Sequence, residues 1–306
     1  MRIVNAEGRL GLVRGDGYID VEAASGGRFE ADVAAVYCRW DEFETWAASV
    51  GDVEVRKLDA YKLGPPSPRP RQVFAIGLNY RDHAEEAGLE APTDSLVVFT
   101  KFASSISGPN DAIVHPTGLV DFETELVVVM SSPTYRVDQD QAWSHVAGLT
   151  LGQDISERGL QLRPPSPQFS LGKSFPGFSP IGPCLVTPDE FVDRDDIELG
   201  CYVNGVQMQK SHTANMVFSV AAIIEYLSAV LPMYPGDVIF TGTPAGIGFS
   251  RVPQCLLEVG DELVTYGVGI GEMQTRFIEA STVNRKVCSQ DAFNQICSPS
   301  TAVTGV

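Results

Sequence analysis

The sequence predicts a mainly β protein with some α-helix, in which a small N-terminal module precedes a larger domain. Short apolar runs rich in β-branched residues, such as VDFETELVVVM at 120–130, are bounded by Gly and Pro and indicate strands. Only SVAAIIEYLSAVL at 219–231 has apolar residues at clear helical spacing. The segment KLGPPSPRPRQ at 62–72 is rich in proline and indicates an extended linker between the two parts.

The N-terminal module is predicted to contain short strands and a weakly patterned helix. Residues 1–21 have turn signals at Glu7-Gly8 and Asp16-Gly17, and residues 41–50 show a helical pattern. We therefore predict a small N-terminal domain at 1–66 and a main domain at 67–280. Residues 281–306 are polar and unpatterned, which predicts a disordered tail.

The main domain opens with a short strand at 73–78 and a helix at 81–87, which Gly88 is placed to end. On this helix His83 and Glu86 are three apart and share a face. Such a pair can orient an imidazole or hold a water between a base and an acid. The alternative is an ordinary contact on a surface helix. A buried strand is expected at 96–101.

The strand at 120–130 carries the carboxylates that the rest of the chain is built around. Asp121, Glu123 and Glu125 lie two apart, so they share one face of a strand. The next apolar run, 146–151, leads to Asp154. Carboxylates that converge from two strands repel one another unless a cation lies between them, and oxygen ligands suit Mg²⁺, Mn²⁺ or Ca²⁺ better than zinc. The alternative is the solvated face of a half-buried strand.

Two loops can carry further functional groups. The proline-rich segment QLRPPSPQF at 161–169 is irregular and suits an active-site lid. The Gly- and Pro-dense segment at 172–183 could hold Lys173 at a fixed point, or it could be an exposed connector. After the strand at 238–241, the glycines of GTPAGIG at 242–248 let backbone N–H groups approach a ligand oxygen, although the segment is no Walker A loop.

Composition narrows the class of protein. The formal net charge of −17 argues against nucleic acid and anionic membrane surfaces as partners. No apolar run approaches a membrane span, and the N-terminus lacks the apolar core of a signal peptide. The six cysteines form no C-x-x-C pair, which indicates reduced thiols without a zinc site. We therefore predict a cytoplasmic protein.

Taken together, the motifs resemble the fumarylacetoacetate hydrolase family. The resemblance covers about residues 72–277 and rests on motifs that occur in the family's order: GLNYRDHAEE, VDFETEL, GQDISERGLQ, GKSFPGFSPIGP, PGDVIFTGTPAGIG and glycine-rich closing strands. It implies an incomplete, rolled-up β-barrel as the fold of the catalytic domain and commonly a homodimer. Pro176 and Gln153 depart from the forms common in the family, as does the segment at 161–169.

The resemblance also implies roles for individual residues. Mg²⁺ or Mn²⁺ would be held by Glu123, Glu125 and Asp154, with Ca²⁺ also compatible. A water-activating dyad and an active-site lysine are implied at His83, Glu86 and Lys173. Substrate contacts are implied at Arg158, Gln161 and Thr243. Asp121 is usual in the family but is not a ligand there, so a supporting role is expected.

The function that these roles imply is metal-dependent cleavage of a C–C bond in a small oxo acid. The substrate class is an acylpyruvate or a related 2-oxo or β-diketo acid, and the reaction runs through a metal-bound enolate. Lys173 would stabilise the developing oxyanion. The alternatives are decarboxylation of an oxaloacetate-type acid, isomerisation or dehydration of a related oxo acid, or a non-catalytic binding protein.

Overall fold

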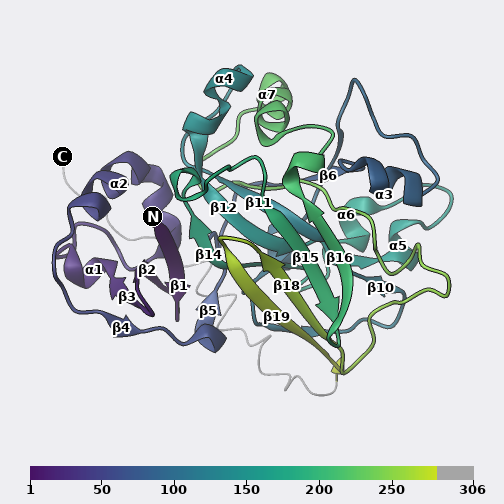
Figure 1. Cartoon of the computed structure of the whole chain (residues 1–306), viewed down its shortest axis with the longest axis horizontal. Coiled ribbons are helices and arrows are strands. Elements are labelled where there is room, and N and C mark those ends of the chain that lie inside the picture. The colour runs from purple at the N-terminus through teal and green to yellow at the C-terminus, as the bar shows by residue number, and fades with distance from the viewer. Residues whose placement is uncertain (281–306) are drawn as a thin grey trace, which may run out of the picture.

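The computed structural model describes residues 1–280, and the tail predicted at 281–306 lies outside the described residues. Figure 1 shows the N-terminal module beside a large twisted sheet, with a second sheet packed across it. Neither sheet closes into a barrel, and strands outnumber helices, so the prediction of a mainly β, incompletely rolled fold is confirmed.

The large sheet has twelve strands and runs through the whole molecule. Its main path, in spatial order, is β4 (Arg56–Lys57), β3 (Gly17–Asp20), β2 (Arg9–Arg14), β1 (Arg2–Ala6), β14 (Ser179–Val186), β12 (Val146–Gln153), β11 (Thr124–Met130), β17 (Val238–Phe240), β6 (Val73–Gly77) and β7 (Val97–Thr100). β5 (Leu63–Gly64) pairs with β1, and β8 (Ile106–Ser107) pairs with β14.

The second sheet has five strands and lies in front of the first in Figure 1. It consists, in spatial order, of β16 (Val206–His212), β15 (Glu198–Val203), β18 (Glu262–Gly267), β19 (Gly271–Ile278) and β9 (Ala112–Val114). A separate pair is formed by β10 (Val120–Asp121) and β13 (Ser156–Glu157). Asn204 and Gly205 form the tight turn that joins β15 to β16, with both residues at positive φ.

Strand β11 is buried on both faces, and this fixes the layers around it. Leu126, Val128 and Met130 contribute to the core beneath α7 (Val220–Val230), the helix predicted at 219–231. The alternate residues Val127 and Val129 belong to a second core, which includes side chains of α2 (Trp40–Ser49) in the N-terminal module. A strand whose two faces both meet apolar layers reads as a continuous hydrophobic run.

The proline-rich segment after β5 is extended but anchored at both ends. Pro65 and Pro66 accept hydrogen bonds from Asn5 and Tyr37 of the N-terminal module, and Ser67 donates to Gly236. The N-terminal strand β1 also pairs directly with β14. The division into domains at residue 66 stays a prediction, and backbone pairing joins the two parts.

Two details of the expected strands are wrong. The run at 120–130 is interrupted, because Phe122 and Glu123 lie between β10 and β11, and the Glu123 N–H donates to the Gln153 side chain instead of to a strand. The strand expected to be buried at 96–101 is the edge strand β7, where Val97 and Val98 are 39% and 40% exposed. An edge strand has one unpaired side, so an apolar sequence there need not be covered.

Candidate active site

Three carboxylates meet where strand β11 begins and strand β12 ends. Glu125 is the second residue of β11, and Asp154 follows directly after β12. The antiparallel pairing of Thr124 with Gln153 places the two segments side by side, and the Asp154 N–H donates to the carbonyl of Glu123 at 2.9 Å. The side chains of Glu123, Glu125 and Asp154 are buried and offer oxygens that all lie within 4.8 Å of one another. The predicted convergence is confirmed, and the solvated-face alternative is wrong.

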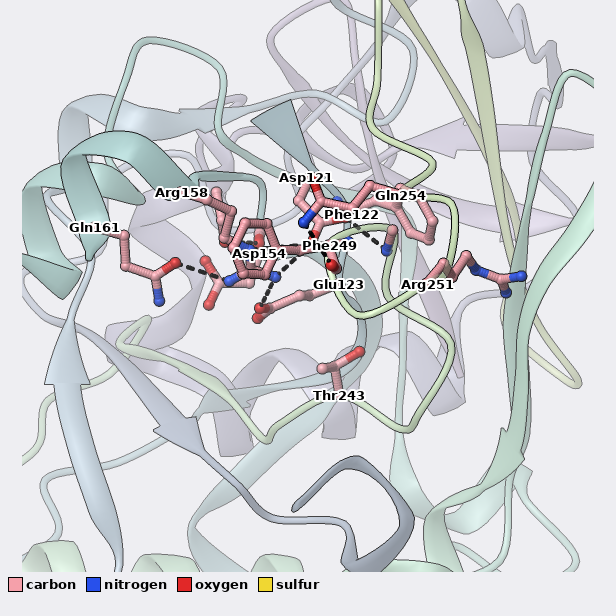
Figure 2. A network of polar contacts seen from close by, with 12 residues as sticks. Asp121, Phe122, Glu123, Asp154, Arg158, Gln161, Thr243, Phe249, Arg251 and Gln254 are labelled. Carbon is pink, nitrogen blue, oxygen red and sulfur yellow. Dashed lines mark hydrogen bonds and ion pairs between the residues drawn. The ribbon is translucent and has the colours of Figure 1, made fainter. Parts of the chain in front are cut away.

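Buried cations surround this cluster. Lys173 Nζ donates to Glu123 Oε2 and to Asp154 Oδ2, each at 2.7 Å. Arg158 Nη2 donates to Glu123 Oε1 at 2.7 Å and to Asp121 Oδ2 at 2.6 Å, as Figure 2 shows. Lys173 is 2% exposed, so the alternative of an exposed connector is wrong for this residue.

The Glu125 carboxylate accepts no hydrogen bond from Lys173 or Arg158, unlike the carboxylates of Glu123 and Asp154. The Gly242 N–H donates to Glu125 Oε2 at 2.7 Å. Burial and the nearby carboxylates of Asp154 and Glu123 hold its pKa well above the usual range. Burial opposes ionisation of Glu123 too, but Lys173 and Arg158 outweigh it and lower the pKa of that residue. Ionisation of Glu125 is therefore the least compensated in the cluster.

This donor set fits a hard divalent cation. Carboxylate oxygens at short mutual distances are the ligands that Mg²⁺ and Mn²⁺ prefer, and a cation would relieve the repulsion that raises the Glu125 pKa. The hydroxyl of Tyr80 and Nδ1 of His83 are buried without a hydrogen-bond partner. Burial, together with the nearby charge of Glu125, raises the pKa of Tyr80. Orphaned polar atoms beside a carboxylate cluster are typical of a site that binds a ligand.

The predicted helix at 81–87 is α3 (Arg81–Glu86), and it brings His83 and Glu86 to the same cavity. His83 Nδ1 lies 3.7 Å from Glu86 Oε2. The Gly246 N–H donates to both oxygens of Glu86, at 3.1 and 3.0 Å. Burial opposes ionisation of Glu86, but His83 and Gly246 outweigh it and lower its pKa, so the carboxylate is ionised at neutral pH and able to accept a proton.

The glycine-rich segment at 242–248 binds carboxylates of the protein itself. The N–H groups of Gly242, Gly246 and Gly248 donate to Glu125, Glu86 and Asp121 respectively. Gly242 and Gly246 have φ of +101° and +107°, a region that L side chains rarely adopt. These three N–H groups thus bind three carboxylates that come from three different segments of the protein, and their approach to a ligand oxygen stays a prediction.

A cavity of about 380 Å³ opens above the cluster. The candidate residues that line it are His83, Glu86, Glu123, Glu125, Arg158, Gln161, Lys173 and Thr243. Asp154 is fully buried beneath them. The sequence therefore identified a single cluster, although the role of each residue stays a prediction.

The three residues predicted to contact substrate differ in how their polar groups are already hydrogen-bonded. Arg158 and Gln161 are held by α5 (Arg158–Gln161), which is capped by the Glu157 carboxylate, and Arg158 Nη1 donates to Gln161 Oε1 at 2.8 Å. The Thr243 hydroxyl donates to the carbonyl of Thr124 at 2.9 Å and accepts from Gln209 at 2.8 Å. Of the three, Thr243 must give up an existing bond before its hydroxyl can donate to a substrate.

Sequence reasoning missed Lys101, which supports the cluster from below. Its side chain is fully buried, and Nζ donates to Asp154 Oδ1 and to the carbonyl oxygens of Lys173 and Phe178. The sequence singled out Gln153 only because it departs from the form common in the family. In the structure its side chain accepts a hydrogen bond from the Glu123 N–H and donates to Thr124 and Thr265. A lysine at the end of an apolar strand was the available signal for Lys101, since a buried lysine requires partners.

We expect Lys101→Met to lower the free energy of unfolding by about 3 kcal/mol or more, because it leaves Asp154 with less compensation for a fully buried charge. Denaturant unfolding of metal-free protein measures this. Lys62→Met is the control, since its exposed pair with Glu7 is expected to contribute ~1 kcal/mol or less. Equal, small losses in both variants would show that Lys101 is not structural.

Comparison with known proteins agrees with the geometry. Residues 72–278 match the model of the fumarylacetoacetate (FAA) hydrolase C-terminal domain. The human protein oxaloacetate tautomerase FAHD2A, mitochondrial, is 42% identical over 200 residues, which are 65% of this chain and 63% of that protein. This chain covers 66% and 63% of the length of two such curated relatives.

Solved structures extend the likeness beyond that domain. A protein provisionally named HpcE from Mycobacterium smegmatis superposes with a TM-score of 0.88 and 51% identity, over 92% of this chain and 100% of that one. Maleylpyruvate hydrolase from Sphingobium sp. SYK-6, in complex with manganese(II) and pyruvate, superposes with a TM-score of 0.74 and 26% identity, over 91% of this chain and 99% of that one. The match over 72–278 and these relatives show that this chain belongs to the fumarylacetoacetate hydrolase family.

Proposed function

We propose that this chain is a divalent-metal-dependent hydrolase that cleaves the C–C bond of an acylpyruvate or a closely related 2-oxo acid. The observation that carries the proposal is the shared cavity: a dyad suited to activating water, His83 and Glu86, lines the same space as Glu123, Glu125 and Lys173. Support also comes from a relative named maleylpyruvate hydrolase, whose structure contains manganese and pyruvate.

The residues of this chain suit the steps of such a hydrolysis. Glu123, Glu125 and Asp154 would hold a divalent ion, which when bound supplies a Lewis acid for the oxygens of the 2-oxo acid. Glu86 takes a proton from water, with His83 beside it, and the water oxygen bonds to the distal carbonyl carbon. The C–C bond then breaks, its electron pair remains on the pyruvate carbon, and the proton that Glu86 took from water goes to that carbon, which gives pyruvate and a free carboxylic acid.

Lys173 is placed to act on the developing negative charge. Two of its three N–H donors bind Glu123 and Asp154, and the side chain lines the cavity, so the third donor is available to an oxygen of the substrate. The fixed position of the ammonium means that little reorganisation is needed during the reaction.

A second candidate reaction is enolisation without attack by water. The human relative is named an oxaloacetate tautomerase, and the same ion and carboxylates would serve tautomerisation, isomerisation or decarboxylation of an oxaloacetate-type acid. Turnover of acetylpyruvate, fumarylpyruvate and oxaloacetate with Mg²⁺ or Mn²⁺, and again with EDTA, separates these. Efficient turnover of oxaloacetate with no cleavage of any acylpyruvate would overturn the hydrolase proposal.

Location and assembly stay predictions. Within residues 1–280, no helix has both the length and the apolar composition needed to cross a lipid bilayer. Curated relatives include mitochondrial proteins, so the cytoplasmic location is not settled by similarity. We propose a homodimer as the assembly, which light scattering of the purified protein tests.

We expect ligand to order α3, because the helix is tied to the 242–248 segment through a single backbone donor, Gly246, and must close over substrate to exclude bulk water. Hydrogen exchange measured with and without oxalate plus Mg²⁺ should show protection of residues 81–88 rising on binding. Exchange in α7 is the internal control and should not change. Strong and equal protection of 81–88 in both states would contradict a lid.

A further inference from the structure

The cavity divides into a polar interior and an apolar mouth. Glu123, Glu125, Arg158 and Lys173 are each at most 6% exposed. The most exposed side chains of the lining are apolar: Leu89, Val97 and Leu162 are 54%, 39% and 46% exposed, compared with 22% for the Glu86 side chain. These three come from separate segments, so the mouth is apolar on several sides. Exposed apolar side chains around a concave site are typical of a binding surface for an apolar group.

Aromatic rings mark where the two parts meet. Lys173 Nζ lies 5.3 Å from the centre of the Phe99 ring, and Phe99 packs on Phe169 with ring centres 5.6 Å apart. On the other side, the Arg158 guanidinium lies 5.9 Å from the Phe249 ring. A substrate whose 2-oxo acid end reaches the carboxylate cluster must therefore pass its remaining groups between apolar side chains.

The cations that line the cavity are already paired. Arg158 donates to both Asp121 and Glu123 and to Gln161, and Lys173 donates to Glu123 and Asp154. The neighbouring Arg251 donates to the carbonyl oxygens of Gly246 and Met208, and Figure 2 shows it pointing away from the cluster. Among the described residues of the cavity wall, none offers an unpaired lysine or arginine at the mouth.

We infer that the substrate is a monocarboxylic acylpyruvate with an apolar acyl group, either an alkyl chain or an aryl ring; this inference rests on the proposed function. A second carboxylate at the acyl end would lose its hydration against an apolar wall without gaining a cation. Each methylene placed in the mouth should instead strengthen binding about threefold to fourfold. Oxaloacetate and maleylpyruvate both carry a second carboxylate, so this chain is expected to differ in preference from the relatives named for them.

Binding of a matched pair of acids to Mn²⁺-loaded protein tests the inference without relying on turnover. 2-Oxohexanoate and 2-oxoadipate have the same number of carbons, but the second ends in a carboxylate. By calorimetric titration we expect 2-oxohexanoate to bind about tenfold tighter or more. Equal affinity, tighter binding of 2-oxoadipate, or binding of neither acid would overturn the inference.

A substitution at the mouth gives a second readout. Leu89→Arg places a cation beside the cavity and should reduce or reverse the preference for 2-oxohexanoate. Leu171→Arg is the control, because Leu171 is similarly exposed at 50% but does not line the cavity, and it should leave the preference unchanged. An equal shift in both variants would mean that general surface charge, and not the mouth, sets the preference.

Turnover then separates this inference from the proposed function. Faster hydrolysis of hexanoylpyruvate than of fumarylpyruvate would support both. If fumarylpyruvate is cleaved faster, the inference fails while the hydrolase proposal stands. If no acylpyruvate is cleaved but 2-oxohexanoate still binds more tightly, the hydrolase proposal fails while the apolar mouth stands.

Discussion

Glu125→Gln is expected to remove metal binding without destabilising the metal-free protein. Burial and the adjacent Asp154 and Glu123 carboxylates raise the pKa of Glu125 and favour its neutral form, so a neutral amide of the same shape should replace it at little cost to stability. Thermal unfolding should show an unchanged or higher Tm for the metal-free variant. Wild-type protein at 100 times the dissociation constant of Mn²⁺ should gain about 2.7 kcal/mol, and the variant should gain almost none at the same concentration. Activity should be lost.

Asp121→Asn is the contrasting control. Its carboxylate accepts from Arg158 and from the N–H groups of Gly248 and Phe249, so the charge is compensated. Breaking this buried pair should lower the stability of the metal-free protein by about 3–5 kcal/mol. If Glu125→Gln destabilises the metal-free protein as much as Asp121→Asn does, Glu125 is a structural residue and the metal-site assignment fails.

The raised pKa of Glu125 also predicts how metal affinity depends on pH. The pKa of Glu125 in the metal-free protein is raised, so this carboxyl retains its proton at pH values where an ordinary glutamate has lost it. A bound cation needs the ionised form, so binding releases the proton and affinity rises with pH until Glu125 is fully ionised. Titrations of Mn²⁺ in two buffers of different ionisation enthalpy at several pH values would measure the proton released.

Glu86→Gln is expected to lower acylpyruvate hydrolysis by roughly a hundredfold or more, the usual scale for losing a general base. The lowered pKa of Glu86 keeps the wild-type side chain ionised, whereas the amide cannot accept a proton. Any decarboxylation of oxaloacetate should fall much less, since it needs no activated water. Steady-state kinetics on acetylpyruvate and oxaloacetate compare the two reactions in one preparation.

Glu85→Gln is the matched control for that experiment. Glu85 is the adjacent residue of α3, is exposed and does not line the cavity, so its loss removes a similar charge without touching the dyad. Its kinetics should match those of the wild type. Intact acylpyruvate cleavage by Glu86→Gln would show that the dyad has no part in water activation.

The parts of the site that could be predicted from sequence are those written within short segments. The spacing of Glu123 and Glu125 and of His83 and Glu86 is local. Asp154 and Lys173 could be singled out from their own segments, and the resemblance implied a role for each. Lys101 escaped notice because its partners Asp154 and Lys173 lie 53 and 72 positions away. Glycine N–H groups were expected near an oxygen ligand, but the carboxylates that they bind, such as Glu86 at 160 positions from Gly246, come from pairings that only the fold creates.

The exposure of β7 was mispredicted for a related reason. Val97 and Val98 belong to an apolar run, and a run of this kind does not reveal whether its strand is central or at the edge. The interruption of the strand at Phe122 and Glu123 depends on Gln153, a side chain from β12 that replaces a strand partner. Local pattern thus predicted which segments are extended, while the neighbours of each strand decided its burial and its length.

Edge strand β7 and the residue that follows it contribute both to the wall of the cavity and to the support of the carboxylate cluster. Val97 and Phe99 line the cavity, and Lys101, two residues further on, holds Asp154. Pairing with β6 sets this register, since Phe99 lies opposite Ala75 and the Lys101 N–H donates to Val73. Point substitutions at 97 or 99 can therefore retune which acids are accepted while Lys101 keeps its place. An insertion or deletion of one residue between Val97 and Lys101 would turn the side chains on one side of the change to the opposite face, so the cavity residues and Lys101 could no longer all keep their places. Among descendants of this sequence, substrate range should consequently diverge through exchanges of side chains on β7, with the length of the strand held constant.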